Sequence, residues 1–315
     1  MKCLITGAGG FLGRHLAFYL AEKGHKVFAA QRGSVGLSQQ GGVVGVRLDV
    51  TDKNAIFKAV DEIKPDTIYH LAGQSLILPS WKDPENTFRI NVMGTVNLFE
   101  AVIHAGISPT ILVACSSAEY KAKSDGTAVT EEDALEPSSP YAVSKMAQDY
   151  LCMVYLRRFN LRIIRMRPFL VTGPGKKQDV CCQFAQGIVD IENGLQKELK
   201  VGNLNAVRDF LDYRDALEAI DLMTTKGKPG DVYNLCSGQG TQIAELLKKM
   251  VQLARTEIKV VQDKSLLRPL DEAIRIGNKD KLTSLGWKIN FNLEQTLEKI
   301  LDYWRDKKAL KGAGQ

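Results

Sequence analysis

A tyrosine and a lysine stand four residues apart in the stretch SSPYAVSK, which begins at Ser138. In a helix, positions i and i+4 lie on one face, so Tyr141 and Lys145 would lie side by side. Pro140 suits the first turn of a helix, and Ser138 or Ser139 could cap it. A free tyrosine has a pKa of about 10, and a nearby ammonium group would lower it. The spacing therefore predicts a proton-transfer pair.

Two adjacent serines precede this pair in the segment CSSAEY, residues 115–120. Either hydroxyl could hydrogen bond to the same substrate oxygen as Tyr141. Such a set of groups moves a proton while a hydride passes to or from a nicotinamide. The catalytic residues that we expect are Ser116 or Ser117 together with Tyr141 and Lys145.

A glycine-rich turn stands near the start of the chain, in ITGAGGFLGRHLA from Ile5 to Ala17. Its glycines have GxxGxxG spacing, after a strand pattern and before a helix pattern. Glycines let the backbone turn tightly and approach a pyrophosphate at a helix N-terminus. The turn therefore predicts a dinucleotide site. The cofactor-binding residues that we expect are Gly7, Gly10, Phe11, Leu12, Gly13, Arg32, Asp49, Val50, Leu71, Ala72, Tyr141 and Lys145.

The end of the second predicted strand bears on the choice of dinucleotide. An NAD site usually has Asp or Glu there to bind the ribose hydroxyls. This sequence has Gln31 and Arg32 instead, and a guanidinium group matches the geometry of a 2′-phosphate. NADP is therefore favoured over NAD. Asp49, at the end of the third strand, either meets the adenine edge or is a polar residue flanking a helix.

Alternating strand and helix patterns surround these motifs. Repeated βα units predict a doubly wound parallel sheet of the Rossmann type over residues 1–168. For residues 169–315 the pattern predicts a smaller mixed α/β domain that binds the substrate, with some segments returning to the sheet. The segment FLVTGPGKKQD, which is rich in glycine and proline, is predicted to be a loop. The expected strands are 2–6, 26–30, 43–48, 67–72, 110–115 and 162–168, and the expected helices are 14–23, 53–63, 84–105, 141–159, 182–193, 243–254 and 293–305.

The composition limits the function classes. The net charge of +6 comes from 42 Lys and Arg against 36 Asp and Glu without a long basic block. No nucleic-acid signature accompanies this small excess, so we expect no nucleic-acid partner. The six cysteines lack zinc-ligand spacing, and we expect no metal. No apolar run reaches membrane-spanning length and no signal-peptide pattern is present, so we expect a cytoplasmic protein without a membrane partner.

Taken together, the motifs resemble the extended short-chain dehydrogenases/reductases that act on nucleotide sugars. The resemblance covers nearly the whole chain, because TGAGGFLG, HLAG, NVMGT, CSS, YAVSK and GDVYNLCSG follow in family order. It implies catalytic roles for a serine, Tyr141 and Lys145, and Ser116 fits the register better than Ser117 when counted back from Tyr120. It also implies a homodimer, formed by the helices predicted at 84–105 and 141–159.

The second half narrows the resemblance. VGNLNAVRDFLDYRD, from Val201 to Asp215, and LRPLDE, from Leu267 to Glu272, are similar to segments of GDP-mannose 4,6-dehydratases and GDP-4-keto-6-deoxymannose reductases. The resemblance implies that two arginines hold the diphosphate and that Asp271 replaces a ribose-binding glutamate. The substrate-binding residues that it implies are Val201, Asn203, Arg208, Arg268 and Asp271. Two further residues of the first half belong to the expected substrate site. Ser75 follows the fourth predicted strand and could reach a sugar hydroxyl, and Asn91 either braces the two long predicted helices or contacts the substrate.

Dehydratases of this group usually carry Thr-x-Glu at the serine position, because they remove a proton from C5 and expel the C6 hydroxyl. Counted from Ser116 that glutamate position is Ala118, whereas counted from Ser117 it is Glu119. The first count favours a reductase. Relatives commonly have asparagine where this chain has Leu170. The resemblance therefore leaves two alternatives for the sugar, which is either held differently here or is another 6-deoxyhexulose.

The leading hypothesis is an NADP-dependent reductase of the C4 keto group of a GDP-4-keto-6-deoxyhexose, forming GDP-rhamnose. The alternative is a GDP-mannose 4,6-dehydratase, or another nucleotide-sugar dehydratase or epimerase, without net cofactor use. A regulatory protein that senses NADP is an alternative of another class. Such a sensor has no need of a serine, tyrosine and lysine set for proton transfer.

Overall fold

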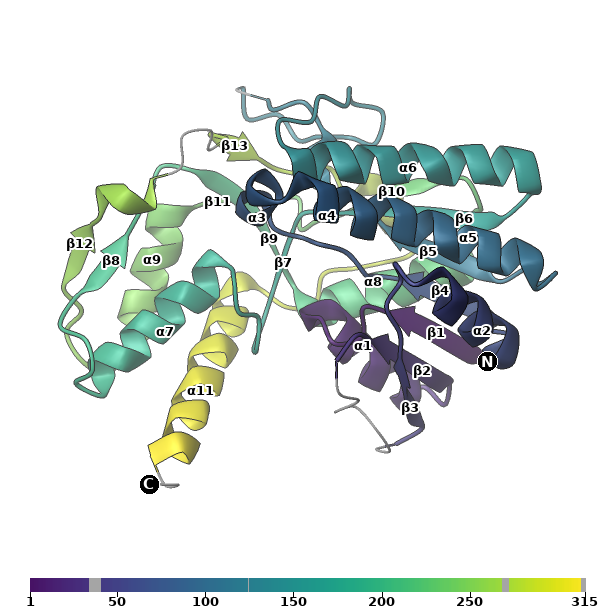
Figure 1. The fold of residues 1–315 in the computed structure, drawn as a ribbon. Helices are drawn as coiled ribbons and strands as arrows, with labels where there is room; N and C mark the ends of the chain where they lie inside the picture. The colour runs from purple at the N-terminus through teal and green to yellow at the C-terminus, as the bar shows by residue number, and fades with distance from the viewer. Residues whose placement is uncertain (34–40, 124, 268–271, 313–315) are drawn as a thin grey trace.

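A seven-stranded parallel sheet forms the centre of the computed structural model, which describes residues 1–33, 41–123, 125–267 and 272–312 (Figure 1). Its strand order is β10-β6-β5-β4-β1-β2-β3, and the order reverses beside β1. Such a reversal opens a crevice at the carboxyl ends of the strands. The doubly wound sheet is confirmed. Its strands are β1 (Lys2–Thr6), β2 (Lys26–Gln31), β3 (Val43–Arg47), β4 (Thr67–His70), β5 (Thr110–Ala114), β6 (Arg162–Pro168) and β10 (Val232–Leu235).

Helices cover both faces of this sheet. Helices α1 (Phe11–Glu22) and α8 (Tyr213–Lys226) pack on one face, and α2 (Lys53–Ile63), α5 (Gly94–His104) and α6 (Pro140–Phe159) pack on the other (Figure 1). Alternate side chains of a strand point to opposite faces. Accordingly Cys3 and Ile5 of β1 lie in one apolar core, and Leu4 lies in the other.

Polar side chains fix where the helices of the site begin. The Ser139 hydroxyl accepts a hydrogen bond from Ala142 N at 3.2 Å, and Pro140 opens α6. Of the two serines considered as caps, Ser139 is therefore the one that caps this helix. Asp52 caps α2 in the same way, through Ala55 N at 3.1 Å. These caps satisfy N–H groups that the helix itself cannot pair.

The long helix expected over residues 84–105 is interrupted. It consists of α4 (Pro84–Phe88), a π-helical turn over Arg89–Met93, and α5. The turn contains Asn91, whose amide bonds to Gln74 and to Ser144 of α6. π-Helical turns leave the regular bonding pattern and are frequent at functional sites. Here the turn coincides with the point where Asn91 bonds inward.

The second half builds a core of its own around α7 (Val180–Glu192), α9 (Ile243–Gln252) and α11 (Leu293–Gly312). Two small sheets accompany these helices (Figure 1). The loop expected after Pro168 is partly a strand, because β7 (Leu170–Thr172) pairs with β9 in parallel. The remaining elements are β8 (Leu199–Val201), β9 (Val207–Asp212), β11 (Gly240–Gln242), β12 (Val260–Gln262), β13 (Ile274–Arg275), α3 (Ile77–Lys82), α10 (Asp280–Thr283) and 3-10 turns over Ser117–Glu119 and Lys264–Leu266.

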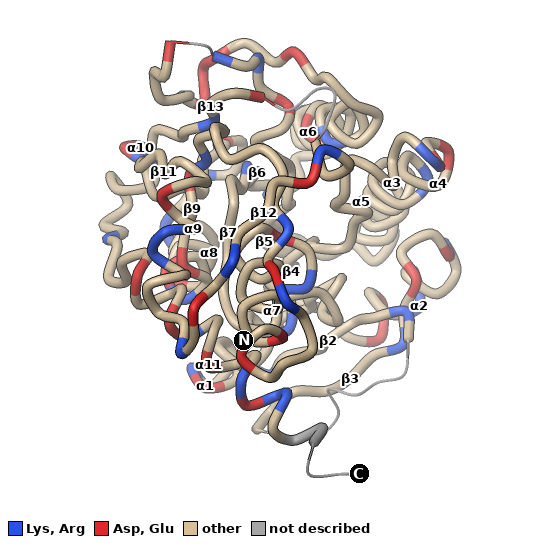
Figure 2. Tube along the Cα trace, turned by 90° about the vertical axis from the view of Figure 1, so that its left-hand side faces the viewer, with Lys and Arg blue, Asp and Glu red and all other residues tan. Residues whose placement is uncertain are grey.

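Two segments of the second half join the first. Strand β10 pairs with β6 at one edge of the central sheet, and α8 packs against α1. Lysines and arginines are interspersed with acidic residues along the chain (Figure 2). Within the described ranges, no helix has both the length and the apolar character that crossing a membrane requires.

Candidate active site

A cleft of about 1670 Å³ runs from the glycine-rich turn to β9, β13 and α11. It is larger than the roughly 300–1,000 Å³ of most small-ligand sites, so it has room for a dinucleotide beside a second ligand. Residues of both halves of the chain line it. The expected site residues in its lining are Gly7, Gly10, Phe11, Leu12, Gly13, Arg32, Asp49, Val50, Leu71, Ala72, Ser75, Ser116, Ser117, Tyr141 and Arg208.

The glycine-rich turn fits a dinucleotide. Gly7 has a φ of +75°, and a Cβ there would lie 2.6 Å from Ala72 N. A Cβ at Gly13 would lie 2.4 Å from the Gly7 carbonyl oxygen, so α1 could not pack as closely on the turn. Gly10 begins α1 without any side-chain cap. The first N–H groups of α1 therefore remain available for a phosphate, which the helix dipole attracts.

Arg32 and Asp49 line the same end of the cleft, after β2 and β3. Asp49 accepts hydrogen bonds from the Thr51 N–H and hydroxyl at 2.9 and 2.8 Å. Burial raises the pKa of Asp49, but these bonds and the charges of Arg32 and Arg89 lower it below its usual value. The carboxylate therefore stays charged beside Arg32. Arg14 also lines the cleft, and the sequence reasoning did not include it.

Ser116 and Tyr141 come together in the middle of the cleft. The Ser116 hydroxyl lies close enough to the Tyr141 hydroxyl to lower its pKa. Ser116 also caps the 3-10 turn, by accepting from Ala118 N at 3.1 Å. Ser117 lines the cleft as well, and its carbonyl oxygen accepts from Tyr120 N. Of the two serines, Ser116 is the one that acts on the pKa of Tyr141.

The pKa of Tyr141 moves opposite to the expected direction. Burial raises it, the Ser116 hydroxyl lowers it only in part, and Glu119 and Cys115 raise it, so that the pKa of Tyr141 is about 12. A lowering by Lys145 was expected, but burial dominates and the ammonium group is engaged with other partners. At neutral pH Tyr141 is therefore protonated and can donate a proton.

Lys145 lies behind Tyr141 on α6 and is buried. Its Nζ donates to the Ala114 carbonyl oxygen at 2.7 Å and to Gln148 Oε1 at 2.8 Å. Burial lowers the pKa of Lys145, although negative neighbours oppose this. A Cβ at Gly73 would lie 3.2 Å from this Nζ, so a small residue is needed between the amine and β4.

Glu119 points away from the cleft, whereas Ala118 lines it. Glu119 Oε1 accepts from Ser116 N at 2.7 Å, and its Oε2 lies 3.5 Å from Arg167 Nε. Burial, together with the charge of Asp149, raises the pKa of Glu119 to about 8. The cleft side of this turn therefore offers a methyl group instead of an acid.

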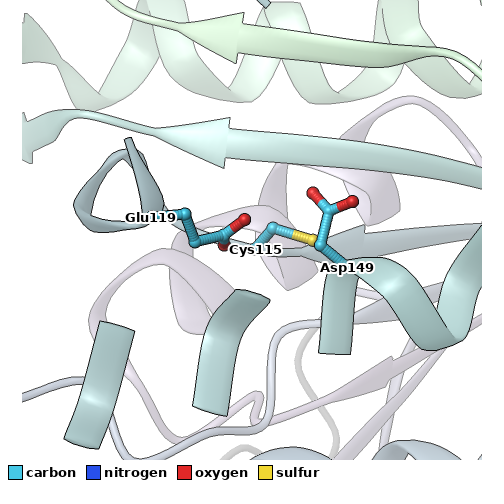
Figure 3. Close-up of side chains that lie close together, drawn as sticks. All are labelled: Cys115, Glu119 and Asp149. Carbon is cyan, nitrogen blue, oxygen red and sulfur yellow. The ribbon is translucent and has the colours of Figure 1, made fainter. Parts of the chain in front are cut away.

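Cys115, Glu119 and Asp149 gather beneath the turn, with their polar atoms within 4.8 Å of one another (Figure 3). Asp149 is neutralised from β6, by Arg165 Nη1 at 2.6 Å and Arg167 Nε at 3.0 Å. Burial raises the pKa of the Cys115 thiol, so it is protonated at neutral pH. The two guanidinium groups thus neutralise the charge of Asp149, and Glu119 is protonated at neutral pH, so the cluster is a buried polar network that supports the turn.

Two arginines lie on the opposite wall of the cleft. Arg208 of β9 and Arg275 of β13 are partners in a parallel register, and both line the cleft. Arg275 also forms a bidentate pair with Glu272 and donates to the Ser117 carbonyl oxygen. Arg275 and Glu272 were missed by the sequence reasoning, because a two-residue strand leaves no periodic pattern. Leu170 lines the cleft too.

The other expected substrate residues are placed differently. Val201 is buried in the core around α7 and α9. Asn203 is not among the described lining residues, and its Oδ1 accepts from Asn205 N at 3.0 Å. Asn91 lies in the π-helical turn and braces it against α6 through its bonds to Gln74 and Ser144, which is one of the two roles expected for it. Arg268 and Asp271 lie outside the described residues.

Comparison with known proteins adds to this geometry. The family model described as GDP-mannose 4,6 dehydratase matches residues 4–300. The chain belongs to this family. GDP-6-deoxy-D-mannose reductase of Pseudomonas aeruginosa is 33% identical over 97% of the chain and 98% of that protein. GDP-mannose 4,6-dehydratase of Vibrio cholerae is 28% identical over 73% of the chain and 66% of that protein.

Solved structures of other proteins share the fold of this GDP-mannose 4,6 dehydratase family member. RMD from Pseudomonas aeruginosa, complexed with NADPH, matches with a TM-score of 0.85 and 32% identity, over 97% of the chain and 99% of that protein. UDP-glucose 4-epimerase of Thermus thermophilus, complexed with NAD, matches with a TM-score of 0.88 and 26% identity, over the same shares. The names span reductases, dehydratases and epimerases, so the reaction has to be argued from the site.

Proposed function

We propose that the chain is an NADPH-dependent reductase of the C4 keto group of a GDP-4-keto-6-deoxyhexose, forming a GDP-6-deoxyhexose such as GDP-rhamnose. One observation carries this choice: Ala118 lines the cleft while Glu119 is turned into the protein. A dehydratase needs an additional acid and base at the sugar, and this turn supplies neither. The 33% identity with a GDP-6-deoxy-D-mannose reductase supports the same reaction.

The proton would come from Tyr141. Its raised pKa keeps the hydroxyl protonated at neutral pH, and the Ser116 hydroxyl lies beside it in the cleft lining. Together the two hydroxyls would hold the carbonyl oxygen of the sugar, and Tyr141 would release its proton to that oxygen. Lys145 would orient the cofactor ribose through its third N–H, because Ala114 and Gln148 take the other two. NADPH supplies the hydride for the carbonyl carbon when bound.

The cofactor would occupy the side of the cleft formed by residues 1–168. Gly7, Gly10 and Gly13 would admit the pyrophosphate to the N-terminus of α1. Arg32 would pair with the 2′-phosphate that distinguishes NADP from NAD. Asp49 would face the adenosine. The apolar lining expected around the cofactor is Phe11, Leu12, Val50, Leu71 and Ala72.

The nucleotide sugar would occupy the side formed mainly by residues 169–315. Arg208 would bind the diphosphate, with Arg268 as its expected second cation. Ser75 would reach a sugar hydroxyl, and Val201, Asn203 and Asp271 would lie toward the nucleoside. For Val201 this contact would be indirect, because its side chain is buried in the core.

A nucleotide-sugar dehydratase or epimerase is the second candidate, and the family contains dehydratases by name. It would cycle its nicotinamide without net consumption. The interior position of Glu119 argues against it. A regulatory NADP sensor would not require Ser116 and Tyr141 to converge in the cleft.

We also propose a homodimer in the cytoplasm. Helix α6 exposes Val143, Tyr150 and Val154 on the side opposite Tyr141 and Lys145, and Met93 is exposed at the start of α5. An apolar face of this kind on a helix is typical of a protein contact. All six cysteines are free thiols and buried, which suits a reducing compartment.

The proposal is tested by mixing the protein with NADPH and GDP-4-keto-6-deoxymannose and following the loss of nicotinamide absorbance. One NADPH consumed per sugar is the expected result. Conversion of GDP-mannose to a keto sugar, with no net loss of NADPH, would instead support the dehydratase. If NADPH were consumed only with another GDP-linked 6-deoxyhexulose, the substrate would be that sugar, and Leu170 would be the residue to examine for this choice.

A further inference from the structure

Gln148 connects the Lys145 amine to the interior of the sheet. It follows Lys145 by three residues on α6, and it is fully buried. Its Oε1 accepts from Lys145 Nζ at 2.8 Å, and its Nε2 donates to Thr95 Oγ1 at 2.7 Å. An ammonium group can only donate, so the amide oxygen must face it and the amide NH₂ must face Thr95.

The bonds beyond Thr95 have one consistent direction. Thr95 Oγ1 donates to the Asn91 carbonyl oxygen at 2.7 Å. His70 Nε2, at 3.0 Å, must therefore donate to Thr95 Oγ1, and His70 Nδ1 accepts from Thr6 Oγ1 at 2.8 Å. This neutral tautomer agrees with the pKa of His70, which burial and the charge of Lys145 lower to about 3.

We propose that Gln148 is a positioning residue, which fixes the Lys145 ammonium group relative to the glycine-rich turn through Thr95, His70 and Thr6. The inference rests on the proposed function. Thr6 is the last residue of β1 and directly precedes Gly7, so the network joins the lysine to the cofactor side of the cleft. Each connecting side chain is buried, and each is hydrogen bonded to the next.

The arrangement also sets how the lysine can act. Lys145 has three N–H donors, of which the described residues take two, through Ala114 and Gln148. The third can bind a ligand hydroxyl only if the other two hold the amine in one orientation. Gln148 does this without adding charge. If the Lys145 amine moved by a fraction of an ångström, its third N–H would no longer point at the ligand hydroxyl.

Other titratable groups face Lys145, and each has to be considered in a pH experiment. Burial lowers the pKa of Lys145, while nearby negative charge raises it. These groups come from the end of β5, from the 3-10 turn, from α6 and from β4: Cys115, Glu119, Tyr141, Cys152 and His70. Substitution at Gln148 leaves all of them in place.

Two variants with opposite effects test the role. Gln148→Met keeps the length of the side chain but removes the acceptor, so Lys145 should lose its proton at lower pH. Gln148→Glu places a carboxylate beside the amine, so Lys145 should hold its proton to higher pH. In a profile of kcat against pH, the alkaline limb should move by about one unit in opposite directions for the two variants. We expect kcat of Gln148→Met to fall roughly tenfold to a hundredfold.

The control is Tyr155→Phe, which removes another side-chain bond of α6, to Glu100 at 2.7 Å, and should keep the wild-type kcat and profile. Limbs that stay unchanged, or that move the same way in both variants, would overturn the inference. NMR titration of the Lys145 amine in ¹⁵N-lysine-labelled protein measures the same opposite shifts without turnover. Failure of the wild-type assay alone would therefore count against the proposed reaction, and failure of the NMR shifts would count against Gln148.

Discussion

Glu119 Oε1 accepts a hydrogen bond from the Ser116 N–H at 2.7 Å, and its Oε2 lies 3.5 Å from Arg167 Nε. This bond fixes the turn that carries Ser116 into the cleft. It also turns the acid of the segment CSSAEY away from any bound sugar. The same contact thus supports the serine and removes the acid that a dehydratase would need.

The Tyr141 hydroxyl should be required for turnover. In Tyr141→Phe the ring stays buried against the same neighbours, but no proton can be given to the substrate oxygen. We expect kcat to fall by about a hundredfold or more. The affinity for NADPH, measured by the fluorescence of the bound cofactor, should be nearly unchanged. A variant that retains most of the wild-type kcat would rule out Tyr141 as the acid.

Glu119 should make the folded state less stable as the pH rises. The pKa of Glu119 is about 8 in the folded chain, whereas the ordinary value of 4.5 applies in the unfolded chain. Between these two pH values only the folded chain holds the proton. The contribution is complete below pH 4.5 and lost as the pH rises to 8, by about 1.4 kcal/mol per pH unit. Denaturant unfolding of wild type and Glu119→Gln should diverge with this slope, and parallel curves would contradict the assignment.

His70 should act at acid pH with the opposite sign. The pKa of His70 is about 3 in the folded chain, whereas the ordinary value of 6.5 applies in the unfolded chain. Below pH 6.5 the unfolded chain therefore takes up a proton that the folded chain does not. Stability is then lost as the pH falls, again by about 1.4 kcal/mol per pH unit. His70→Gln should remove this slope in urea unfolding. The exposed His104, changed to Gln, is the control and should leave the slope as it is.

Arg32 should decide between the two nicotinamide cofactors. A charge-assisted hydrogen bond to a phosphate is worth about 1.5–3 kcal/mol, which corresponds to roughly a tenfold to hundredfold change in affinity. Arg32→Ala should weaken NADPH binding by that factor and leave NADH binding nearly constant. Equal losses for both cofactors would show that Arg32 does not read the 2′-phosphate.

The exposed face of α6 should hold two copies of the chain together. Val154→Lys places a charge in the middle of that face, where the wild type exposes Val143, Tyr150 and Val154. Sedimentation should show a dimer for the wild type and mainly monomer for the variant. A control at the other end of the molecule is Leu195→Lys, since Leu195 is also exposed and lies after α7. A monomeric wild type would refute the dimer directly.

Local patterns predicted the elements that carry the cofactor side. The β-branched runs correspond to strands β1 to β6, and the predicted ends differ from the observed ends by two residues at most. These strands could be predicted because buried parallel strands consist of consecutive apolar residues. The glycine turn and the capped start of α6 were also predicted, because each depends on residues that are adjacent in the sequence. The family match over residues 4–300 agrees with the resemblance on which the reductase hypothesis was based.

Long-range contacts could not be read in this way. The raised pKa of Tyr141 follows from burial, which depends on how α6 packs on the sheet. Strand β13 has two residues and exists only through its pairing with β9, so Arg275 left no signal. The π-helical turn likewise depends on bonds between Asn91 and segments distant in sequence.

The most direct measurement is the fate of the hydride itself. NADPH carrying deuterium on its transferable position would be incubated with GDP-4-keto-6-deoxymannose, and the product sugar examined by mass spectrometry and NMR. The account predicts one deuterium at C4 for each NADPH consumed, and labelled product that forms about a hundredfold or more slowly with Tyr141→Phe. A product without deuterium, or deuterium that stays on the cofactor, would contradict it.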